Sequence, residues 1–431
     1  MSTAFLLSLG GFLLLSAVRV PISFAMFAGA ILYLFVTGQD VGLVAEQSLN
    51  GLFDGFVLLS VPLFIIAASF MNAGTVSDRL LAFCQALVGR FKGGLGHVNV
   101  VASIIFAGMS GSAIADAAGI GKVIIDMMRR NNRYPAGYAA AITAASSVIG
   151  PIIPPSIPMV LYALVSDTSI GYLFLGGVVP GLLLGVVLMI YNGWAASRRH
   201  FPVDEVVPLA ELPKRTVNAL PPLLLPVILL GGIYGGATTP TEAASVAAFY
   251  ALVLAAVVYR ALSLRAFGEL VLDASRSTAV VGLIIASALV FNYIVASENI
   301  PGLVAASLKG LDIHPVLFLL LINLLFLALG CLFDATTLLL IVIPLFLPTA
   351  RELGIDLVHF GVVMVVNIMI GLITPPYGVL LFVISGVCKI PLGSIIREIW
   401  PFIGVLIVAL LLMVLFPQIV LWLPQQFGYR G

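Results

Sequence analysis

Apolar segments follow one another along almost the whole chain and are separated by short clusters of Gly, Pro and charged residues. A helix that crosses a bilayer needs about 20 predominantly apolar residues. We predict spans at 3–18, 20–37, 52–72, 172–197, 216–235, 240–259, 276–298 and 396–423, with a short amphipathic arm at 76–92. The pattern predicts an all-α polytopic membrane protein.

Four longer apolar blocks are interrupted by Gly, Pro and small polar residues. They are 97–130, broken at Gly108–Ser112; 134–166, broken at Gly150–Pro155; 314–350, broken at Gly330–Asp334; and 356–388, broken at Gly371–Gly378. Unwound backbone is tolerated at membrane depth only where protein or a cavity satisfies its polar groups. We interpret the first and third blocks as re-entrant hairpins, and the second and fourth as helices that cross once with an unwound middle.

The amino-acid composition restricts the classes of protein to which this chain can belong. Of 431 residues, 61% are hydrophobic and 9% are charged, which excludes a soluble enzyme and a disordered chain. The net charge of +1 leaves no basic surface for nucleic acid. No charged region precedes Phe5, so the first segment is predicted to be a span of the mature protein and not a signal peptide. No nucleophile–base set, HExxH motif or metal-ligand cluster is found, so neither an enzyme nor a cofactor is expected.

The distribution of cationic residues supports the two hairpins. If 97–130 and 314–350 each enter and leave on one side, sixteen of the 20 Lys and Arg residues fall on one side, three (Lys309, Arg351 and Arg430) on the other, and Lys122 lies inside the first hairpin. Short cytoplasmic loops carry the excess of Lys and Arg. The basic side is therefore predicted to be cytoplasmic, with both termini on the opposite side.

The two halves of the chain show the same order of elements, and we predict two inverted repeats at 1–215 and 216–431. Each has two spans, an arm, a span, an arm, a hairpin, a broken span and a closing span. Gly108 precedes Pro154 by 46 residues, and Gly330 precedes Pro375 by 45. Inverted repeats with discontinuous helices place substrate and ion sites near the midplane, at the broken segments.

Each pair of breaks is predicted to bind one Na⁺ ion, because Gly and Pro free backbone carbonyls and Ser or Thr add hydroxyl oxygens, which together suit a hard cation. The first site comprises Ser110, Gly111, Ser112, Gly150, Ile153 and Pro155. The second comprises Gly330, Asp334, Gly371, Thr374 and Tyr377. The alternative is that the prolines are simple kinks and the hydroxyls bond back to their own helices.

Candidate substrate-binding residues lie beside the same breaks. They are Ser112, Asp116, Ser156, Thr336 and Pro376. An ionisable residue inside the membrane is a functional candidate by default. Asp116 has an alternative partner, because Lys122 is close in sequence.

Two further features are expected to be structural. Thr239-Pro-Thr-Glu242 is a capping box with Pro at the first helical position, so Glu242 is expected to cap a span. The stretch Arg260–Arg276 is expected to form a cationic arm at the cytoplasmic interface, with its basic side chains near lipid phosphates.

Four runs carry a resemblance to a known family. They are GGIYGGATTPTEAASVAAFY at 231–250, AASSVIGPIIPPS at 144–156, ITPPYG at 373–378 and VPISFAM at 20–26. These runs resemble the large membrane subunit of tripartite ATP-independent periplasmic (TRAP) transporters, of the DctM or SiaM type, over nearly the whole chain.

The resemblance implies a fold like that of the divalent-anion/sodium symporters, with a scaffold and a mobile elevator domain that holds both hairpins. It also implies Na⁺-driven import without ATP across the bacterial inner membrane. The substrate would be an organic acid, such as a sialic acid or C4-dicarboxylate, delivered by a periplasmic binding protein. A small four-helix membrane subunit would be a separate chain, because no additional N-terminal four-span block is present. One departure is Cys331-Leu-Phe at the second tip, where more Gly, Met or polar residues would be expected.

Two other functions remain open at this point. A stand-alone sodium/anion symporter of the same fold would need no binding protein. A passive channel would conduct without Na⁺ coupling, although no filter-like motif is present. No Arg stands at either hairpin tip to clamp a carboxylate, so substrate choice is expected to lie mostly with the binding protein.

Overall fold

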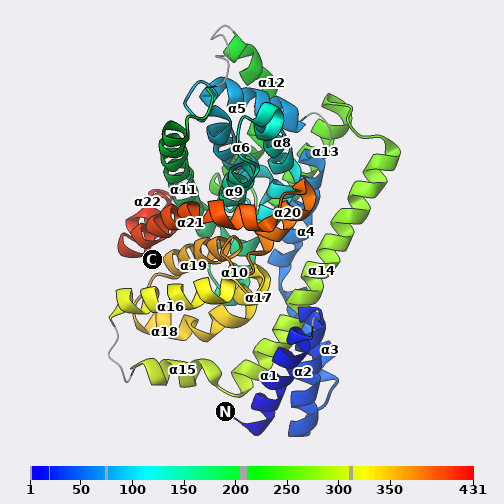
Figure 1. Ribbon diagram of the computed structural model, residues 1–431. Helices are drawn as coiled ribbons and strands as arrows, with labels where there is room; N and C mark the ends of the chain where they lie inside the picture. Colours follow the sequence, from blue (N-terminus) through cyan, green and yellow to red (C-terminus); the bar gives the residue numbers. More distant parts are fainter. Residues whose placement is uncertain (1, 19, 73–75, 204–210, 310–313) are drawn as a thin grey trace.

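The computed structural model describes residues 2–18, 20–72, 76–203, 211–309 and 314–431, and in these ranges the chain is helical without strands (Figure 1). Within this part of the chain, five helices are long and apolar enough to cross a bilayer, or six if the bent pair Leu43–Phe53 and Phe56–Met71 forms one span. Eight further apolar helices have 10–17 residues. The mixture of complete spans and short apolar helices confirms the predicted all-α membrane fold.

The first half of the chain contains eleven α-helices among its described residues. They are α1 (Thr3–Ala17), α2 (Ile22–Thr37), α3 (Leu43–Asp54), α4 (Ser60–Met71), α5 (Val76–Val88), α6 (Gly94–Ser110), α7 (Ala113–Asp116), α8 (Lys122–Arg129), α9 (Ala136–Ser147), α10 (Ile157–Ser166) and α11 (Ile170–Arg199). A π-helical segment at 117–121 joins α7 to α8 without a break. The first predicted hairpin is therefore α6 followed by α7–α8, and α9 and α10 are the two parts of the first broken helix.

The second half contains another eleven α-helices among its described residues. They are α12 (Leu212–Tyr234), α13 (Pro240–Val253), α14 (Leu264–Ser297), α15 (Ile300–Lys309), α16 (Pro315–Gly330), α17 (Ala335–Thr337), α18 (Leu347–Glu352), α19 (Leu357–Gly371), α20 (Val379–Cys388), α21 (Leu392–Leu415) and α22 (Gln418–Gln426). Here α16 and α17–α18 form the second hairpin, again with a π-helical segment in the returning arm, at 338–342. Helices α19 and α20 are the parts of the second broken helix.

The cationic stretch before the span at 276–298 differs from expectation. It does not form a separate arm, because a single 34-residue helix, α14, runs from Leu264 to Ser297. The Ser263 hydroxyl accepts a hydrogen bond from the Ala266 amide and starts the helix. An ion pair between Arg265 and Glu269, four residues apart, then supports a polar first segment that continues directly into the apolar one.

The last predicted span, 396–423, is not one continuous helix in the structure. Helix α21 ends at Leu415, and α22 begins only at Gln418. Phe416 has φ −122° and ψ 79°, outside the helical region, and Pro417 follows it; the residue before a proline is disfavoured in the helical conformation. The C-terminal apolar segment is therefore two helices that meet at a bend.

The helices pack into two groups. Helices α1–α4 pack with α12–α14, and this group is called the scaffold here. The hairpins and broken helices pack with α11, α21 and α22, and this group is called the hairpin body. In Figure 1 the scaffold helices α1–α3 and α14 lie along the right side and α16–α19 lie to their left. Helix α5 contacts both α12 and α6, so it connects the two groups.

The first parts of the broken helices are the centre of the hairpin body. Every residue of α9 from Gly137 to Ser147 and every residue of α19 from Val358 to Gly371 is buried. Helix α9 consists largely of Ala, Ser and Thr, so other helices approach it closely; a Cβ atom on Gly137 would lie 2.5 Å from the Ser394 carbonyl oxygen at the start of α21. These two helices fix the positions of the breaks that follow them.

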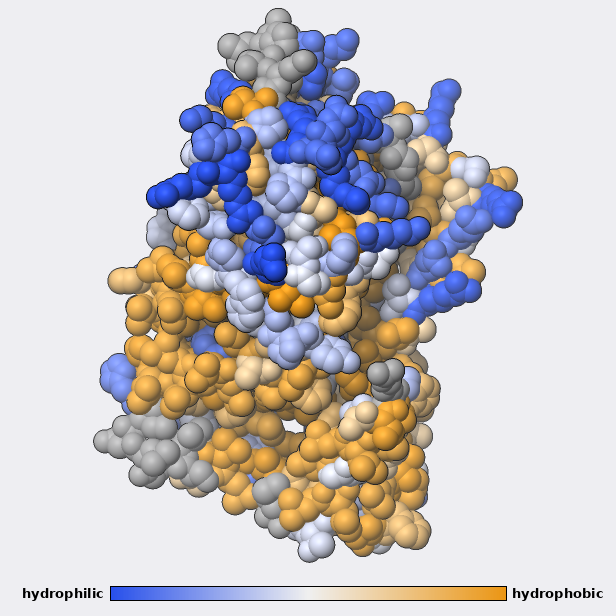
Figure 2. Space-filling model, in the orientation of Figure 1, coloured by the Kyte–Doolittle hydropathy of each residue, from blue (hydrophilic) through white to orange (hydrophobic). Residues whose placement is uncertain are grey.

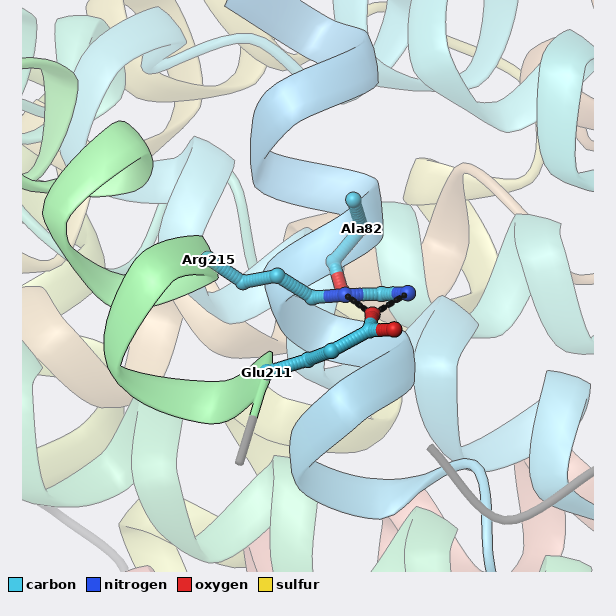
Figure 3. Close-up of polar contacts among 3 residues, drawn as sticks. All are labelled: Ala82, Glu211 and Arg215. Carbon is cyan, nitrogen blue, oxygen red and sulfur yellow. Dashed lines mark hydrogen bonds and ion pairs between the residues drawn. The ribbon is translucent and has the colours of Figure 1, made fainter. Parts of the chain in front are cut away.

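Hydrophilic residues gather at one end of the face shown in Figure 2, over the region where Figure 1 places α5, α8 and the start of α12. The rest of that face is mainly hydrophobic. Among the contacts at the hydrophilic end, the Arg215 guanidinium of α12 donates to the Ala82 carbonyl of α5 at 3.1 Å and forms an ion pair with Glu211 at 2.8 Å (Figure 3). The start of α12 is thus attached to the connecting helix α5.

Candidate functional site

A cavity of about 480 Å³ lies where the scaffold meets both hairpin tips. The hairpin body contributes residues 110–115 of the first tip, residues 334–336 of the second tip, and Pro151, Ile157, Pro158, Met369, Leu372 and Val379 from the broken helices. The scaffold contributes Ile65, Ala68 and Ser69 of α4, the following residue Asn72, and Ser277, Val280, Val281 and Ile284 of α14. The two pairs of breaks, far apart in sequence, therefore converge on one space.

The cavity wall contains hydroxyls, one amide and one carboxylate, but no Lys or Arg among the residues that line it. The carboxylate is that of Asp334, and the amide is that of Asn72. Four helices contribute residues of their first turn: α7, α10, α17 and α20. Helix N-termini carry unpaired N–H groups and a partial positive charge. Among the lining residues, partial positive charge is therefore available only from these helix N-termini and not from cationic side chains.

The first hairpin tip is tightly packed against the first break. Gly111 has φ +60°, and a Cβ atom there would lie 2.5 Å from the Pro155 carbonyl oxygen. Ser112 caps the returning arm, because its hydroxyl accepts a hydrogen bond from the Ala115 amide at 3.4 Å. Only glycine can adopt the positive φ at position 111 and also leave room for the Pro155 carbonyl oxygen, because it has no side chain. Ser110, Gly111 and Ser112 all line the cavity.

Asp116 lies behind this tip and is not among the residues that line the cavity. Its side chain is 2% exposed and accepts a hydrogen bond from the Ser110 hydroxyl. Its second oxygen has no hydrogen-bond partner and points to Gly150, where a Cβ atom would come within 2.3 Å of it. Lys122 is exposed, and Asp116 forms no ion pair among the described residues. The alternative of an Asp116–Lys122 pair is therefore not observed.

The remaining residues of the first break serve to close it. Ser156 is buried; its hydroxyl donates to the Pro151 carbonyl and accepts from the Met159 amide at 3.2 Å. Ile153 packs against Gly181 of α11, where a Cβ atom would lie 2.3 Å from its Cγ1. Pro154 and Pro155 are joined by a cis peptide bond. Of these residues, Ser156 was predicted to face the substrate, but it does not line the cavity.

The second tip differs from the first in that its carboxylate lies at the tip itself. Asp334 lines the cavity and caps the returning arm, since it accepts hydrogen bonds from the Thr337 amide at 3.1 Å and from the Thr337 hydroxyl. Thr336 also lines the cavity. Gly330 and Gly371 are in direct backbone contact, because a Cβ atom on Gly371 would lie 2.8 Å from the Gly330 Cα. These glycines hold the second hairpin against the second break.

Three predicted residues of the second break lie outside the cavity. The Thr374 hydroxyl donates back to the Ile370 carbonyl of its own helix at 2.7 Å, as the alternative interpretation anticipated. Pro376, which follows Pro375 through a cis bond, is exposed. Tyr377 is 55% exposed and packs against Phe382. The structure therefore does not bring Pro376 or Tyr377 to the space between the tips.

Sequence reasoning missed a pair of buried polar clusters. In the first half of the chain, Asn99 of α6 donates to Thr143 of α9 at 2.6 Å, and Ser103 donates to Ser146 at 2.9 Å. In the second, Asn367 of α19 donates to the Asn323 side-chain oxygen of α16 at 2.7 Å. Each cluster joins the first arm of a hairpin to the first part of a broken helix.

A sequence signal for these clusters exists. Ser146 precedes Pro154 by eight residues, and Asn367 precedes Pro375 by eight. Polar residues inside apolar spans usually face other helices and form hydrogen bonds there. The cavity residues Ser69, Asn72 and Ser277 of the scaffold were missed for another reason: nothing in the sequence says which scaffold face meets the tips.

Paired helical hairpins and paired broken helices around one cavity are typical of membrane transporters of the inverted-repeat class. The family model described as "Tripartite ATP-independent periplasmic transporter, DctM component" matches residues 9–419, and the chain belongs to this family. It is a large permease subunit and a multi-pass protein of the bacterial inner membrane.

Known proteins agree with this assignment. The chain is 42% identical to the sialic acid TRAP transporter large permease protein SiaM of Vibrio cholerae, over 98% of this chain and 99% of that protein. It is 42% identical to the C4-dicarboxylate TRAP transporter large permease protein DctM of Pseudomonas aeruginosa, over 87% and 88%. The structure resembles the YdaH transporter of Alcanivorax borkumensis with a TM-score of 0.66 at 16% identity, over 96% of this chain and 98% of that one, which shows a shared fold.

Proposed function

We propose that this permease imports an organic acid anion together with Na⁺, by movement of the hairpin body across the scaffold. TRAP large permease subunits work with a periplasmic binding protein and a small membrane subunit. We expect the same partners here. The named relatives handle a sialic acid and C4-dicarboxylates, and we propose a substrate of this carboxylate-bearing class.

The observation that carries the proposal is a cavity without a cationic side chain at the meeting point of both hairpin tips. An anion in such a space needs its charge balanced, and the four helix N-termini supply only part of that balance. Na⁺ held at the breaks would supply the rest. Ion and substrate would then stabilise each other's binding, which is the reciprocal coupling that symport requires.

We assign the first Na⁺ site to Ser110, Gly111, Ser112, Gly150, Ile153 and Pro155, and add Asp116 to it. The unpartnered Asp116 oxygen beside Gly150 supports this addition, because a buried charged oxygen without a partner is costly unless a cation compensates it. We assign the second site to the segment around Gly330, Asp334, Gly371 and Thr374. Tyr377 is the least supported member of that set, given its exposure.

For substrate binding we favour Ser112 and Thr336, which line the cavity from opposite tips. The scaffold wall comes from the last turns of α4 and from the part of α14 just after Arg276. Both segments lie toward the side that the cation distribution predicts to be cytoplasmic. The arrangement corresponds to an inward-facing state of the proposed cycle.

The test is uptake into proteoliposomes that contain this chain, its small subunit and the binding protein, with labelled N-acetylneuraminate or succinate outside. A Na⁺ gradient should drive accumulation, and an equal choline gradient should not. Uptake without Na⁺ would overturn the coupling. Uptake that needs no binding protein would instead identify a stand-alone symporter.

A further inference from the structure

The hairpins pack across the repeat boundary. The returning arm of the first hairpin, α7–α8, contacts α20, which belongs to the second repeat. The returning arm of the second hairpin contacts α10, which belongs to the first repeat. Each half-helix that follows a break is therefore held by the hairpin of the other half of the chain.

An arginine makes the last contact in each of these pairs. Arg129, the last residue of α8, donates to the carbonyl oxygen of Cys388 at 3.2 Å. Arg351, near the end of α18, donates to the carbonyl oxygen of Ser166 at 2.9 Å. Cys388 and Ser166 are the last residues of α20 and α10, so both arginines satisfy a carbonyl at a helix C-terminus.

The two acceptor ends have the same local geometry. The residue after Ser166 is Asp167 with φ 59°, and the residue after Cys388 is Lys389 with φ 52°. Both are left-handed C-cap residues, whose amides close the last helical turn. Each guanidinium thus reaches the carbonyl immediately before the left-handed residue.

The two donors also have the same position in sequence. Arg129 follows Gly108 by 21 residues, and Arg351 follows Gly330 by 21. Arg129 precedes Pro154 by 25 residues, and Arg351 precedes Pro375 by 24. A cation at a helix C-terminus is common, but two that match in register, each supplied by the opposite repeat, are not expected from local capping alone.

Arg351 differs from Arg129 in the side of the membrane on which it is predicted to lie. The predicted topology places it among only three cations on the non-cytoplasmic side, where Lys and Arg are disfavoured in short loops. Arg129, in contrast, lies on the basic side, where topology alone would account for it. The contact with Ser166 gives a structural reason for a cation at position 351.

We propose that Arg129 and Arg351 are positioning residues that stabilise the hairpin body. Arg129 fixes α20, which follows the second break, and Arg351 fixes α10, which follows the first break. These two contacts together are called the brace. The brace keeps both breaks in a constant position relative to the opposite tip while the body moves. Its effect on ion binding rests on the proposed Na⁺-coupled function, whereas the crosswise contacts themselves do not.

Hydrogen–deuterium exchange of the full chain in lipid nanodiscs tests the brace directly. Arg129→Gln should speed amide exchange in α20 by about fivefold to tenfold and leave α10 unchanged, and Arg351→Gln should do the reverse. Lysine at either position should restore most of the protection, because it keeps a charged donor. Matched controls are Arg130→Gln and Glu352→Gln, since these neighbours are exposed like Arg129 and Arg351 but form no hydrogen bond to α20 or α10 among the described residues.

Exchange that rises only in the mutated hairpin, or equally in both half-helices, would overturn the inference. So would a control variant that reproduces the crosswise pattern. A second measurement follows Na⁺-dependent thermal stabilisation of the same proteins, with choline as the reference. Each Arg→Gln variant should need about threefold to tenfold more Na⁺ for half of the wild-type effect. Wild-type protein that shows no Na⁺-specific stabilisation would contradict the proposed function but leave the exchange result to decide the brace.

Discussion

The two hairpin tips have the same architecture but place their carboxylates differently. In the first half of the chain, Asp116 lies one turn behind the tip, is buried and keeps one oxygen without a hydrogen-bond partner, beside Gly150. In the second, Asp334 lies at the tip itself, lines the cavity and uses both oxygens to cap its own helix. Both hairpins therefore carry a carboxylate near a break, but the two carboxylates differ in their hydrogen bonds. Asp116 keeps one oxygen without a hydrogen-bond partner, whereas both oxygens of Asp334 accept hydrogen bonds within its own helix.

The glycines at the two tips also differ in how closely they approach their neighbours. Gly111 approaches a carbonyl oxygen with a left-handed backbone, whereas the nearest neighbour of Gly330 is farther away: its Cβ atom would lie 3.1 Å from the Gly371 Cα and 3.7 Å from the Ile368 carbonyl oxygen. The first tip is thus closed by a more demanding contact than the second. We expect the first tip to tolerate substitution less well.

The largest expected effect is that of Gly111→Ala. The added methyl meets the Pro155 oxygen, and the left-handed backbone alone costs about 1–3 kcal/mol for a residue other than glycine. Na⁺-driven uptake should fall to background, while Gly330→Ala should retain measurable uptake. Gly119→Ala is the matched control, because nothing lies within 4 Å of its new methyl. Equal loss in Gly111→Ala and Gly330→Ala would remove the difference between the tips.

The carboxylates give the next largest difference. Asp116→Asn should raise the Na⁺ concentration for half-maximal uptake by at least tenfold, or about 1.4 kcal/mol, because it removes the charge next to Gly150. Asp334→Asn should have a smaller effect, since asparagine also caps helices well. Asp126→Asn, an exposed change in the same hairpin as Asp116, serves as the control. Uptake kinetics against Na⁺ decide the order, and a larger shift for Asp334→Asn would reverse the comparison.

The hydroxyls should have intermediate effects. Ser112→Ala removes an N-cap bond worth about 1 kcal/mol together with a cavity hydroxyl. Thr374→Ala removes a bond that the hydroxyl makes to its own helix, so its cost should be lower. Proteoliposome uptake at varied Na⁺ measures both. If neither variant alters the dependence on Na⁺, the assignment of the two ion sites is wrong.

A site far from both tips should give the smallest effect and serve as the reference. Hydrogen bonds from the hydroxyl and amide of Ser2 hold the pKa of the Glu298 carboxyl below its ordinary value, with a further bond from Tyr33. Because its folded-state pKa is depressed, this contribution to stability is fully present above the unfolded-state pKa and is lost as pH falls through the folded-state pKa.

Glu298→Gln should therefore lower the melting temperature slightly near pH 7, and the difference from wild type should disappear as the pH falls through the depressed folded-state pKa of the Glu298 carboxyl. Thermal unfolding between pH 7 and pH 3 measures this. The Na⁺ dependence of uptake should be the same as in the wild type. A changed Na⁺ dependence in this variant would mean that the effects at the tips are not specific to them.

The sequence predicted much of this fold because breaks in membrane helices are made by residues that stand out. Gly111, Gly150, Pro154 and their counterparts interrupt otherwise uniform apolar blocks, so the hairpins and broken helices could be placed within a few residues. The capping box at Thr239–Glu242 was equally local, and both of its bonds are present. Local chemistry of this kind needs no knowledge of tertiary packing.

The direction of individual side chains could not be predicted in the same way. Ser156 and Thr374 satisfy nearby carbonyls, Pro376 and Tyr377 face outward, and Asp116 turns away from the cavity. Which way an unwound segment presents its side chains depends on the helices around it, such as the α11 glycines that admit Ile153. The continuity of α14 was missed because the polar segment before the span was treated as a boundary, whereas its Arg and Glu residues are good helix formers.

The continuity of α14 has a consequence for the lipid around the protein. At 1.5 Å per residue, its 34 residues extend for about 51 Å, compared with about 30 Å for the hydrocarbon core of a bilayer. The excess must be met by tilt or by projection of the charged first segment into the headgroup region. Since Ser277 and Ile284 on the same rigid helix form part of the cavity wall, acyl-chain length would adjust the depth at which that wall sits in the membrane.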